Sequence, residues 1–274
     1  MTVQSRYSSL MDLRQVTPQP LRTVAGFVTV GLVLLVWWYV TSGTVAEQRL
    51  VSPTVLPSPL EVWRSAASLV TERHLIAGIA ASMQRVLIGF GLAVVVGVPL
   101  GVLSGSWRVF EAGGAPFAVF GRNLPVAALI PLTLLWFGID ETQKVMFIFI
   151  ACVPFVYSST VTAIGTVPDR YVETAQTLGA SELQVVGKVL VPLALPSIYD
   201  SLRQLFGLAF GYIMLAEMVN AERGLGQLLI TSQRRSIPEH VILILVIISL
   251  LAYLIDRLLL WFQRGLFPYR AAEA

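Results

Sequence analysis

Residues 86–107 read VLIGFGLAVVVGVPLGVLSGSW, a run of 22 positions without a charged side chain. A helix that crosses the hydrocarbon core of a bilayer needs about 20 mostly apolar residues. The apolar residues are continuous and do not alternate with polar ones, which favours a helix over a strand of a membrane barrel. The run therefore predicts a membrane-spanning helix over 79–105.

Five further apolar runs emerge from the gaps between charges. Four of them contain uncharged stretches long enough to form a span or most of one, including a nearly solid apolar core from Phe27 to Val40. The fifth run is interrupted by Arg203 and Glu217. Together the runs predict about six spanning helices, at 24–42, 79–105, 113–137, 143–164, 197–219 and 241–262.

The composition of the whole chain agrees with this pattern. Of its 274 residues 55% are hydrophobic and only 13% are charged, and the mean hydropathy is +0.75. Soluble domains carry about 25% charged residues, and disordered chains are poor in aliphatic residues. The single Cys152 excludes a disulfide scaffold. The net charge of +3, without a basic block, argues against a nucleic-acid partner. These figures predict an all-α integral membrane protein.

The first run has a competing interpretation as a signal peptide, because Arg22 precedes its apolar stretch. The stretch is long for such a peptide and no convincing small-x-small cleavage site follows it. We therefore expect an uncleaved span. Basic residues in the loops divide eight against seven and do not decide the orientation. The N-terminal tail holds three arginines and only Asp12 before the first span, which predicts that both termini are cytoplasmic.

Three features near the spans leave alternatives open. The stretch from Leu60 to Val70 has helical spacing of apolar residues, and it predicts either an amphipathic helix on the outer interface or a connector packed on the bundle. The small residues Gly97, Gly101 and Gly105 mark one helix face, which suits either packing within one subunit or a dimer contact. The third span is interrupted by prolines, which indicates a broken helix beside a polar path or a packed kink. Those prolines are Pro116, Pro125 and Pro131.

The loop at 165–195, here named the coupling loop, has the pattern of two short helices. Asp169 is expected to open the first helix after Pro168, and Gly179 is expected to stop it. Ser181 and Gln184 form a capping-box pattern for a second helix, from Glu182 to about Leu190, which Pro192 and Pro196 would end. The loop is too polar to enter the membrane. It predicts an element that docks on a soluble partner.

The same loop resembles the EAA motif of the permeases of ABC importers. The family pattern is Glu-Ala-Ala, three residues, Gly, nine residues, then Ile-x-Leu-Pro. In this chain Glu173, Ala175, Gly179 and Pro192 match it outright, whereas Thr174, Val189 and Val191 are substitutions.

The resemblance extends from about Val55 to Asp256, and it is to permeases of the sulfonate, taurine and nitrate uptake group. The matching segments are LPSPLEVW at 56–63, SxxRVxxGF at 82–90, GxPLG at 97–101, PxxxLWFG at 131–138, AEM at 216–218 and GLG at 224–226. Two departures, Asp200-Ser201 and Arg122-Asn123-Leu124-Pro125, put the identity of the substrate in doubt and not the family.

The resemblance implies a type I importer permease in the bacterial cytoplasmic (inner) membrane. Such a permease pairs as a dimer, here expected to be a homodimer, on two ATPase subunits. A periplasmic or lipoprotein binding protein delivers the solute, and alternating access moves it across the bilayer. The coupling helix would lie at 169–179 and touch the ATPase, with Asp169, Glu173, Ala175, Gly179 and Pro192 as the residues concerned.

No enzymatic activity and no cofactor are expected in this chain. Its one Gly-Lys pair, Gly187-Lys188, lacks the first glycine of a phosphate-binding loop, because Glu182 stands there. ATP and Mg²⁺ would therefore be bound by the partner ATPase. His74 and His240 are isolated in sequence, and no metal-ligand spacing or catalytic motif is present. Cys152 is interpreted as a packing residue.

Charged and polar residues inside spans are costly, so they are candidates for the translocation path or its gate. Arg203 lies near the inner end of its span, where it could snorkel or contact the coupling loop. Glu217 lies near the outer end, where it could brace a gate or meet the binding protein. Arg122 and Asn123 could face the path. For each of the four residues a purely structural role is the alternative.

Two other functional classes are alternatives, a stand-alone secondary transporter or channel and an intramembrane enzyme. The first would require uptake without an ATPase, and the second a catalytic constellation that the sequence lacks. The expected organisation has four parts: a tail at 1–22, the first span and outer segment at 23–78, a five-helix core at 79–264 that includes the coupling loop, and a tail at 265–274.

Overall fold

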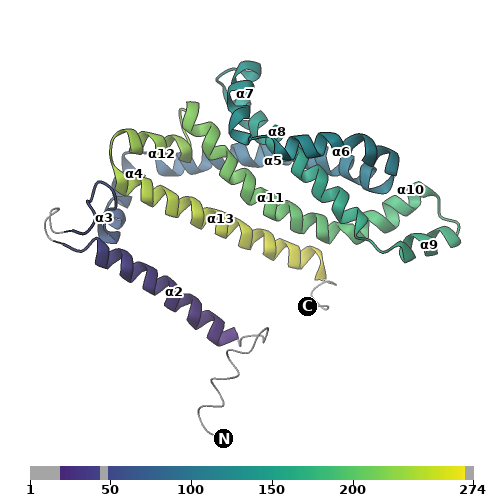
Figure 1. The fold of residues 1–274 in the computed structure, drawn as a ribbon, viewed down its shortest axis with the longest axis horizontal. Helices are drawn as coiled ribbons and strands as arrows, with labels where there is room; N and C mark the ends of the chain where they lie inside the picture. Colours follow the sequence, from purple (N-terminus) through teal and green to yellow (C-terminus); the bar gives the residue numbers. More distant parts are fainter. Residues whose placement is uncertain (1–18, 44–48, 269–274) are drawn as a thin grey trace, which may run out of the picture.

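All the regular structure is helical in the part of the chain that the computed structural model describes, residues 19–43 and 49–268. Five helices are long and apolar enough to cross a membrane (Figure 1). They confirm five of the six predicted spans and extend most of them by several residues. These helices are α2 (Gln19–Val40), α5 (Leu75–Ser106), α8 (Glu141–Gly165), α11 (Val191–Asn220) and α13 (Pro238–Leu266).

The region predicted as the third span, 113–137, is a bent pair of helices, as its prolines predict, and it gives a sixth span if the pair counts as one. Helix α6 (Arg108–Asn123) ends before Pro125, and the short helices η2 (Val126–Ala128) and α7 (Leu129–Phe137) follow at an angle of 89°. Leu124 is extended, with ψ of 127°, because the ring of a following proline disfavours the helical conformation. The chain therefore turns sharply at this point.

Helices α5, α8 and α11 contact one another in pairs and enclose the core. The largest fully buried side chains include Phe147 and Ile148 of α8 and Phe210 and Ile213 of α11. By contrast, most of the apolar side chains of α2 are exposed, and the spanning window of α13 is only 6% buried within the chain. Such exposed apolar surface is suited to lipid or to a neighbouring membrane helix.

The glycines of α5 form the contact with α8. A Cβ atom placed on Gly97 would lie 2.8 Å from the Val156 side chain, and one on Gly101 would lie 2.5 Å from Cβ of Thr160. Gly105 faces Ile164 in the same way. The order of these contacts shows that α5 and α8 run parallel. The close approach predicted from the glycine spacing therefore occurs within one subunit.

Replacing Gly101 by leucine is expected to destabilise the protein, because the added side chain overlaps α8. Forcing extra carbon atoms into a tight contact costs about 1–3 kcal/mol. The measurement is the thermal unfolding temperature in detergent. Gly91→Leu is the matched control, since Gly91 lies on the same helix with nothing within 4 Å of its added Cβ. Equal unfolding temperatures for the two variants would contradict the packing.

The segment before α5 forms two short helices, α3 (Pro59–Arg64) and α4 (Ala66–Thr71), and not one continuous helix. The helix breaks at Ser65, whose hydroxyl bonds back to the carbonyl of Val62. Leu69 is fully buried and Val62 is 6% exposed, so the segment packs on the bundle. The connector interpretation is therefore correct for this face, although Trp63 remains 76% exposed.

An ion pair fixes the start of α3. Arg49 donates two hydrogen bonds to Glu61, which also closes a capping box with Ser58. The hydrogen bonds from Arg49 are the main cause that lowers the pKa of Glu61 to about 2. A depressed carboxyl pKa stabilises the fold above the ordinary value near 4.5, and the gain is lost as the pH falls toward 2. The pair is therefore charged at any neutral or mildly acidic pH.

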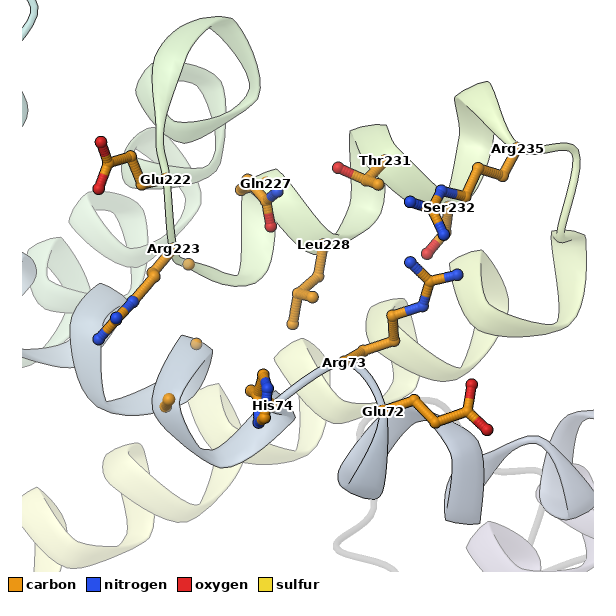
Figure 2. A pocket seen from close by; sticks show the side chains of 13 residues that line it. Glu72, Arg73, His74, Glu222, Arg223, Gln227, Leu228, Thr231, Ser232 and Arg235 are labelled. Carbon is orange, nitrogen blue, oxygen red and sulfur yellow. The ribbon is translucent and has the colours of Figure 1, made fainter.

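The two ends of the bundle differ. Helices α9 (Asp169–Thr177) and α10 (Glu182–Val185) project from one end, and α3, α4 and α12 (Leu225–Arg234) form the other, here named the distal end (Figure 1). The first turn of α2 and the last turn of α13 each lie nearer to α9 than the opposite end of the same helix does. The tails predicted at 1–22 and 265–274 lie largely outside the described residues. The distal end contains a pocket of about 480 Å³ between α12 and the α4–α5 turn (Figure 2).

Candidate functional site

The first half of the coupling loop folds as the sequence predicts. Helix α9 begins at Asp169 and ends at Thr177. The amide of Gly179 donates to the carbonyl of Gln176, and the amide of Ala180 donates to that of Ala175. This hydrogen-bond pattern is a Schellman motif, which requires a residue with positive φ. Gly179 supplies it with φ of 84°, so its predicted role as a helix stop is confirmed.

The second half of the loop differs from the prediction. Ser181 and Gln184 form the expected capping box at the start of α10. However, Pro192 and Pro196 do not end the helix, because α10 continues through η3 (Val186–Leu190), a π-helical stretch, into α11. Wider π turns accommodate local strain, and this one directly precedes Pro192, whose ring would otherwise crowd the preceding turn. The result is one continuous helix of 38 residues, Glu182–Val219.

The coupling loop presents a surface with few contacts to the rest of the chain. None of the residues of α9 is buried, and Glu173 is exposed. Leu178 and Leu183 beside it are 83% and 74% exposed. A hydrogen bond joins the loop to the start of α6, because the Trp107 indole donates to the Glu182 carboxylate over 3.1 Å. Asp169, Glu173, Ala175 and Gly179 share this projecting unit, whereas Pro192 lies within the helix that leads into the membrane.

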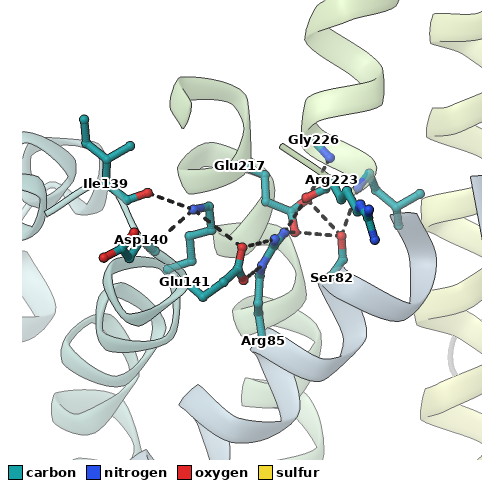
Figure 3. Close-up of polar contacts among 10 residues, drawn as sticks. Ser82, Arg85, Ile139, Asp140, Glu141, Glu217, Arg223 and Gly226 are labelled. Carbon is teal, nitrogen blue, oxygen red and sulfur yellow. Dashed lines mark hydrogen bonds and ion pairs between the residues drawn. The ribbon is translucent and has the colours of Figure 1, made fainter. Parts of the chain in front are cut away.

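Glu217 lies at the distal end in a network of polar contacts (Figure 3). Its side chain is fully buried. Its carboxylate accepts hydrogen bonds from the Ser82 hydroxyl at 2.7 and 2.8 Å, from Nη1 of Arg85 at 2.6 Å and from the amide of Gly226 at 2.9 Å. The carboxylate is therefore not exposed to a soluble partner in this structure, and its contacts with the binding protein stay a prediction.

Arg85 joins Glu217 to a second carboxylate. Its Nε and Nη2 donate to the two oxygens of Glu141 at 2.5 and 2.6 Å, and Nη1 also donates to the carbonyl of Arg223. Lys144 lies 3.9 Å from Glu141. Two cations and two carboxylates therefore balance, although only Arg85, Lys144 and Glu217 are buried and the Glu141 side chain is 64% exposed. The network connects α5, α8, α11 and the turn before α12.

Glycines allow the turn after α11 to close over this carboxylate. Gly224 has φ of 140°, a conformation that side chains rarely adopt, and a Cβ there would collide with the Glu217 carboxylate. A Cβ on Gly226 would lie 2.6 Å from the carbonyl of Met214. The glycines of the GLG segment thus let the backbone come close enough for the amide of Gly226 to donate to the Glu217 carboxylate.

Neither Arg85 nor Glu141 is predicted as a functional residue from the sequence. Both residues lie at the border of an apolar run, where a charge is usually assigned to the interface. Glu217 is the residue from which this network could have been predicted, because a carboxylate buried in a span requires a cation at the same depth in the membrane. Arg85 and Glu217 each lie close to the distal end of their helices, so their pairing was accessible from the predicted spans.

Arg203 and Asn123 do not share a site with Glu217. Arg203 forms an ion pair with Asp256 of α13 at 2.5 Å. Asn123 donates to the carbonyl of Val119 within its own helix. Glu217, Arg203 and the neighbouring Arg122 and Asn123 of α6 are therefore not brought together in one site.

Arg122 lines an open groove of about 310 Å³, here named the hydroxyl groove. Most of the other lining residues are serines and threonines of α8 and α11. The Ser158 hydroxyl is buried without a hydrogen-bond partner in the described part of the chain. The lining contains one cation and no carboxylate. Its members are Arg122, Phe155, Ser158, Ser159, Thr162, Ala163, Thr166, Ser197 and Ser201.

Comparison with known families gives a match over residues 97–268, to the family described as "Binding-protein-dependent transport system inner membrane component". The chain belongs to this family. The matched range covers most of the helical core and the whole coupling loop, so the features described above are those of an ABC-importer permease.

Curated relatives cover nearly the whole chain. The taurine transport system permease protein TauC of Escherichia coli (strain K12) is 31% identical, over 88% of each protein. The nitrate import permease protein NrtB of Synechocystis sp. is 29% identical, also over 88% of each. The putative aliphatic sulfonates transport permease protein SsuC of Bacillus subtilis (strain 168) is 29% identical, over 87% of this chain and 85% of the relative.

Solved structures show the same fold. An inward-facing MetNI methionine ABC transporter aligns with a TM-score of 0.61 and 23% identity, over 70% of this chain and 95% of that one. An amino acid ABC transporter aligns with a TM-score of 0.62 and 20% identity, over 73% of this chain and 97% of that one. The protein is thus a multi-pass membrane permease with the fold of ABC importers.

Proposed function

We propose that this permease forms the translocation path of an ATP-driven importer for a small organic or inorganic anion. It works with two copies of a separate ATPase and with a periplasmic or lipoprotein binding protein. The observation that carries the proposal is the family match combined with the projecting coupling loop. In this arrangement the permease carries out no ATP chemistry, and ATP and Mg²⁺ are bound by the ATPase.

The coupling loop supplies the contact with the ATPase. Asp169 to Gly179 docks in a cleft of that subunit, with Leu178 as an apolar anchor and Glu173 as a polar one. Exposed apolar side chains at the centre of a projecting element are typical of an interface. When two ATPases close on ATP, the two coupling loops of a permease homodimer move together and tilt the spans attached to them. The path then opens toward the binding protein.

Two observations support an anion as the solute. The relatives named above are described as permeases for taurine, aliphatic sulfonates and nitrate. The hydroxyl groove of this chain offers donors and one guanidinium without a carboxylate. Hydroxyl groups replace part of the hydration shell of an anion, and a single cation attracts it without holding it tightly. The groove would form half of the path in the dimer. In this arrangement the α9 end and both termini lie in the cytoplasm.

Reconstitution tests this function directly. The permease is co-purified with the ATPase that it brings down and placed in liposomes, and the uptake of labelled taurine, an alkanesulfonate and nitrate is measured with and without the binding protein. We expect uptake of at least one anion that requires both ATP and the binding protein. Uptake by the permease alone, driven by an ion gradient, would instead establish a stand-alone transporter.

A further inference from the structure

The pocket at the distal end has an excess of unpaired positive charge (Figure 2). Arg73, Arg223 and Arg235 line it. Glu72 and Glu222 lie along its lining as well, but within residues 19–43 and 49–268 none of the three arginines forms an ion pair with a carboxylate. Arg49 and Arg85, which lie near this end outside the pocket, are both paired. The pocket lining therefore combines three arginines with two glutamates, and none of these arginines is in an ion pair within the described residues.

A hydroxyl lines the same pocket. Ser232 belongs to the pocket wall, and the residue as a whole is 5% exposed. In Figure 2 the side chain of Arg73 extends toward Ser232 from the α4–α5 turn, and that of Arg235 extends toward it from the end of α12. Two guanidinium groups thus flank one hydroxyl.

The start of α5 adds further donors. His74 precedes the helix with φ of 52° and provides no side-chain cap, so the first amides of a 32-residue helix have no partner from the cap. His74, Ala77 and Gly78 lie on the pocket wall. The N-terminus of a helix carries partial positive charge and attracts anions. Arginines, a hydroxyl and free amides are the groups that recognise an oxyanion.

We propose that this pocket binds one carboxylate or sulfonate group between Arg73 and Arg235, with the Ser232 hydroxyl as a third donor. The group has two possible sources, the solute released by the binding protein or an acidic side chain of the binding protein itself. The assignment of the pocket to the side of the binding protein rests on the proposed function. The binding of an anion to the pocket is independent of that function, because it can be measured on the permease alone.

The first experiment titrates the full-length permease in nanodiscs with sodium methanesulfonate and follows the unfolding temperature. Dimethyl sulfone, which has a similar shape and no charge, is the ligand control. We expect a saturable rise on the order of 5 °C for the anion and none for the sulfone. Arg73→Gln and Arg235→Gln should each weaken the apparent affinity at least tenfold. Arg234→Gln should not, because Arg234 is exposed beside the pocket but does not line it.

The second experiment measures the affinity of the binding protein for the same variants in nanodiscs. If the anion in the complex is an acidic side chain of the binding protein, Arg73→Gln and Arg235→Gln weaken docking at least tenfold, in addition to their effect on the titration. If it is the solute, the two substitutions change the titration and leave docking unchanged. A permease whose unfolding temperature does not respond to methanesulfonate would overturn the proposal. Failure of ATP-driven uptake in reconstitution would leave the titration result intact.

Discussion

Replacing Arg85 by methionine is expected to destabilise the permease by about 3–5 kcal/mol, because the variant leaves Glu217 charged and buried without its cation. Arg85 is 4% exposed and Glu217 is fully buried, so water cannot replace the lost contact. The loss also frees the carbonyl of Arg223 and the oxygens of Glu141. The unfolding temperature in detergent should fall by on the order of 10 °C.

Two further variants separate the ion pair from other effects of the substitution. Arg203→Met breaks a second intramembrane pair, but its partner Asp256 has a side chain that is 42% exposed, so the cost should stay within about 1 kcal/mol. The double variant Arg85→Met with Glu217→Gln removes the unpaired charge and should recover most of the stability. An Arg85→Met protein as stable as the parent, or a double variant no better than the single one, would show that the pair does not hold the distal end together.

Replacing Glu173 by arginine is expected to abolish ATP-driven uptake while the permease remains folded. Glu173 is exposed on α9 and contacts little in this chain, so the change should leave the unfolding temperature unchanged. Reversing a charge in a buried interface costs about 2–5 kcal/mol, which corresponds to roughly a 30-fold to several thousand-fold loss of affinity for the ATPase. Co-purification of the ATPase and uptake in liposomes measure the two effects. Glu222→Arg, at the distal end, is the control, since it should retain the ATPase.

Substitutions at Gly179 test whether the backbone turn or the free space beside it matters. Gly179 has positive φ, and apart from its two chain neighbours no described residue has an atom within 4 Å of an added Cβ. Asparagine tolerates positive φ, whereas valine does not. If the turn alone is required, Gly179→Asn should keep uptake and Gly179→Val should lose it. If the ATPase packs against this position, both should fail. Full uptake by Gly179→Val together with Glu173→Arg would contradict the role of the loop in coupling.

The positions of the spans could be predicted from the sequence because charges are excluded from the hydrocarbon core. The gaps between charges therefore locate α5, α8 and α13 to within a few residues. The 89° bend at Pro125 was expected as an irregularity, but its angle depends on the contacts of α6 and α7 with α8. The continuous helix through Pro192 was not predictable, since local proline rules do not include the π turn that accommodates the ring.

Only the parts of the candidate site that are formed by residues close together in the sequence could be predicted. The Schellman turn at Gly179 follows from neighbouring residues, and the structure has it as predicted. The partners of Glu217 lie 132 and 135 residues earlier in the chain, at Arg85 and Ser82, and the packing of three helices brings them together. The same holds for the distal pocket, where Arg73 and Arg235 come from segments far apart in sequence.

The uninterrupted helix from Glu182 to Val219 joins the coupling loop at one end to the Glu217 network at the other. At 1.5 Å per residue its 38 residues extend about 57 Å. If it pivots near its middle, a tilt of about 5° displaces each end by about 2.5 Å, which exceeds the tolerance of a hydrogen bond. A small rotation imposed at α9 would then be enough to separate Glu217 from Ser82 and Arg85. Breaking these contacts at the distal end would therefore need no large rearrangement of the permease.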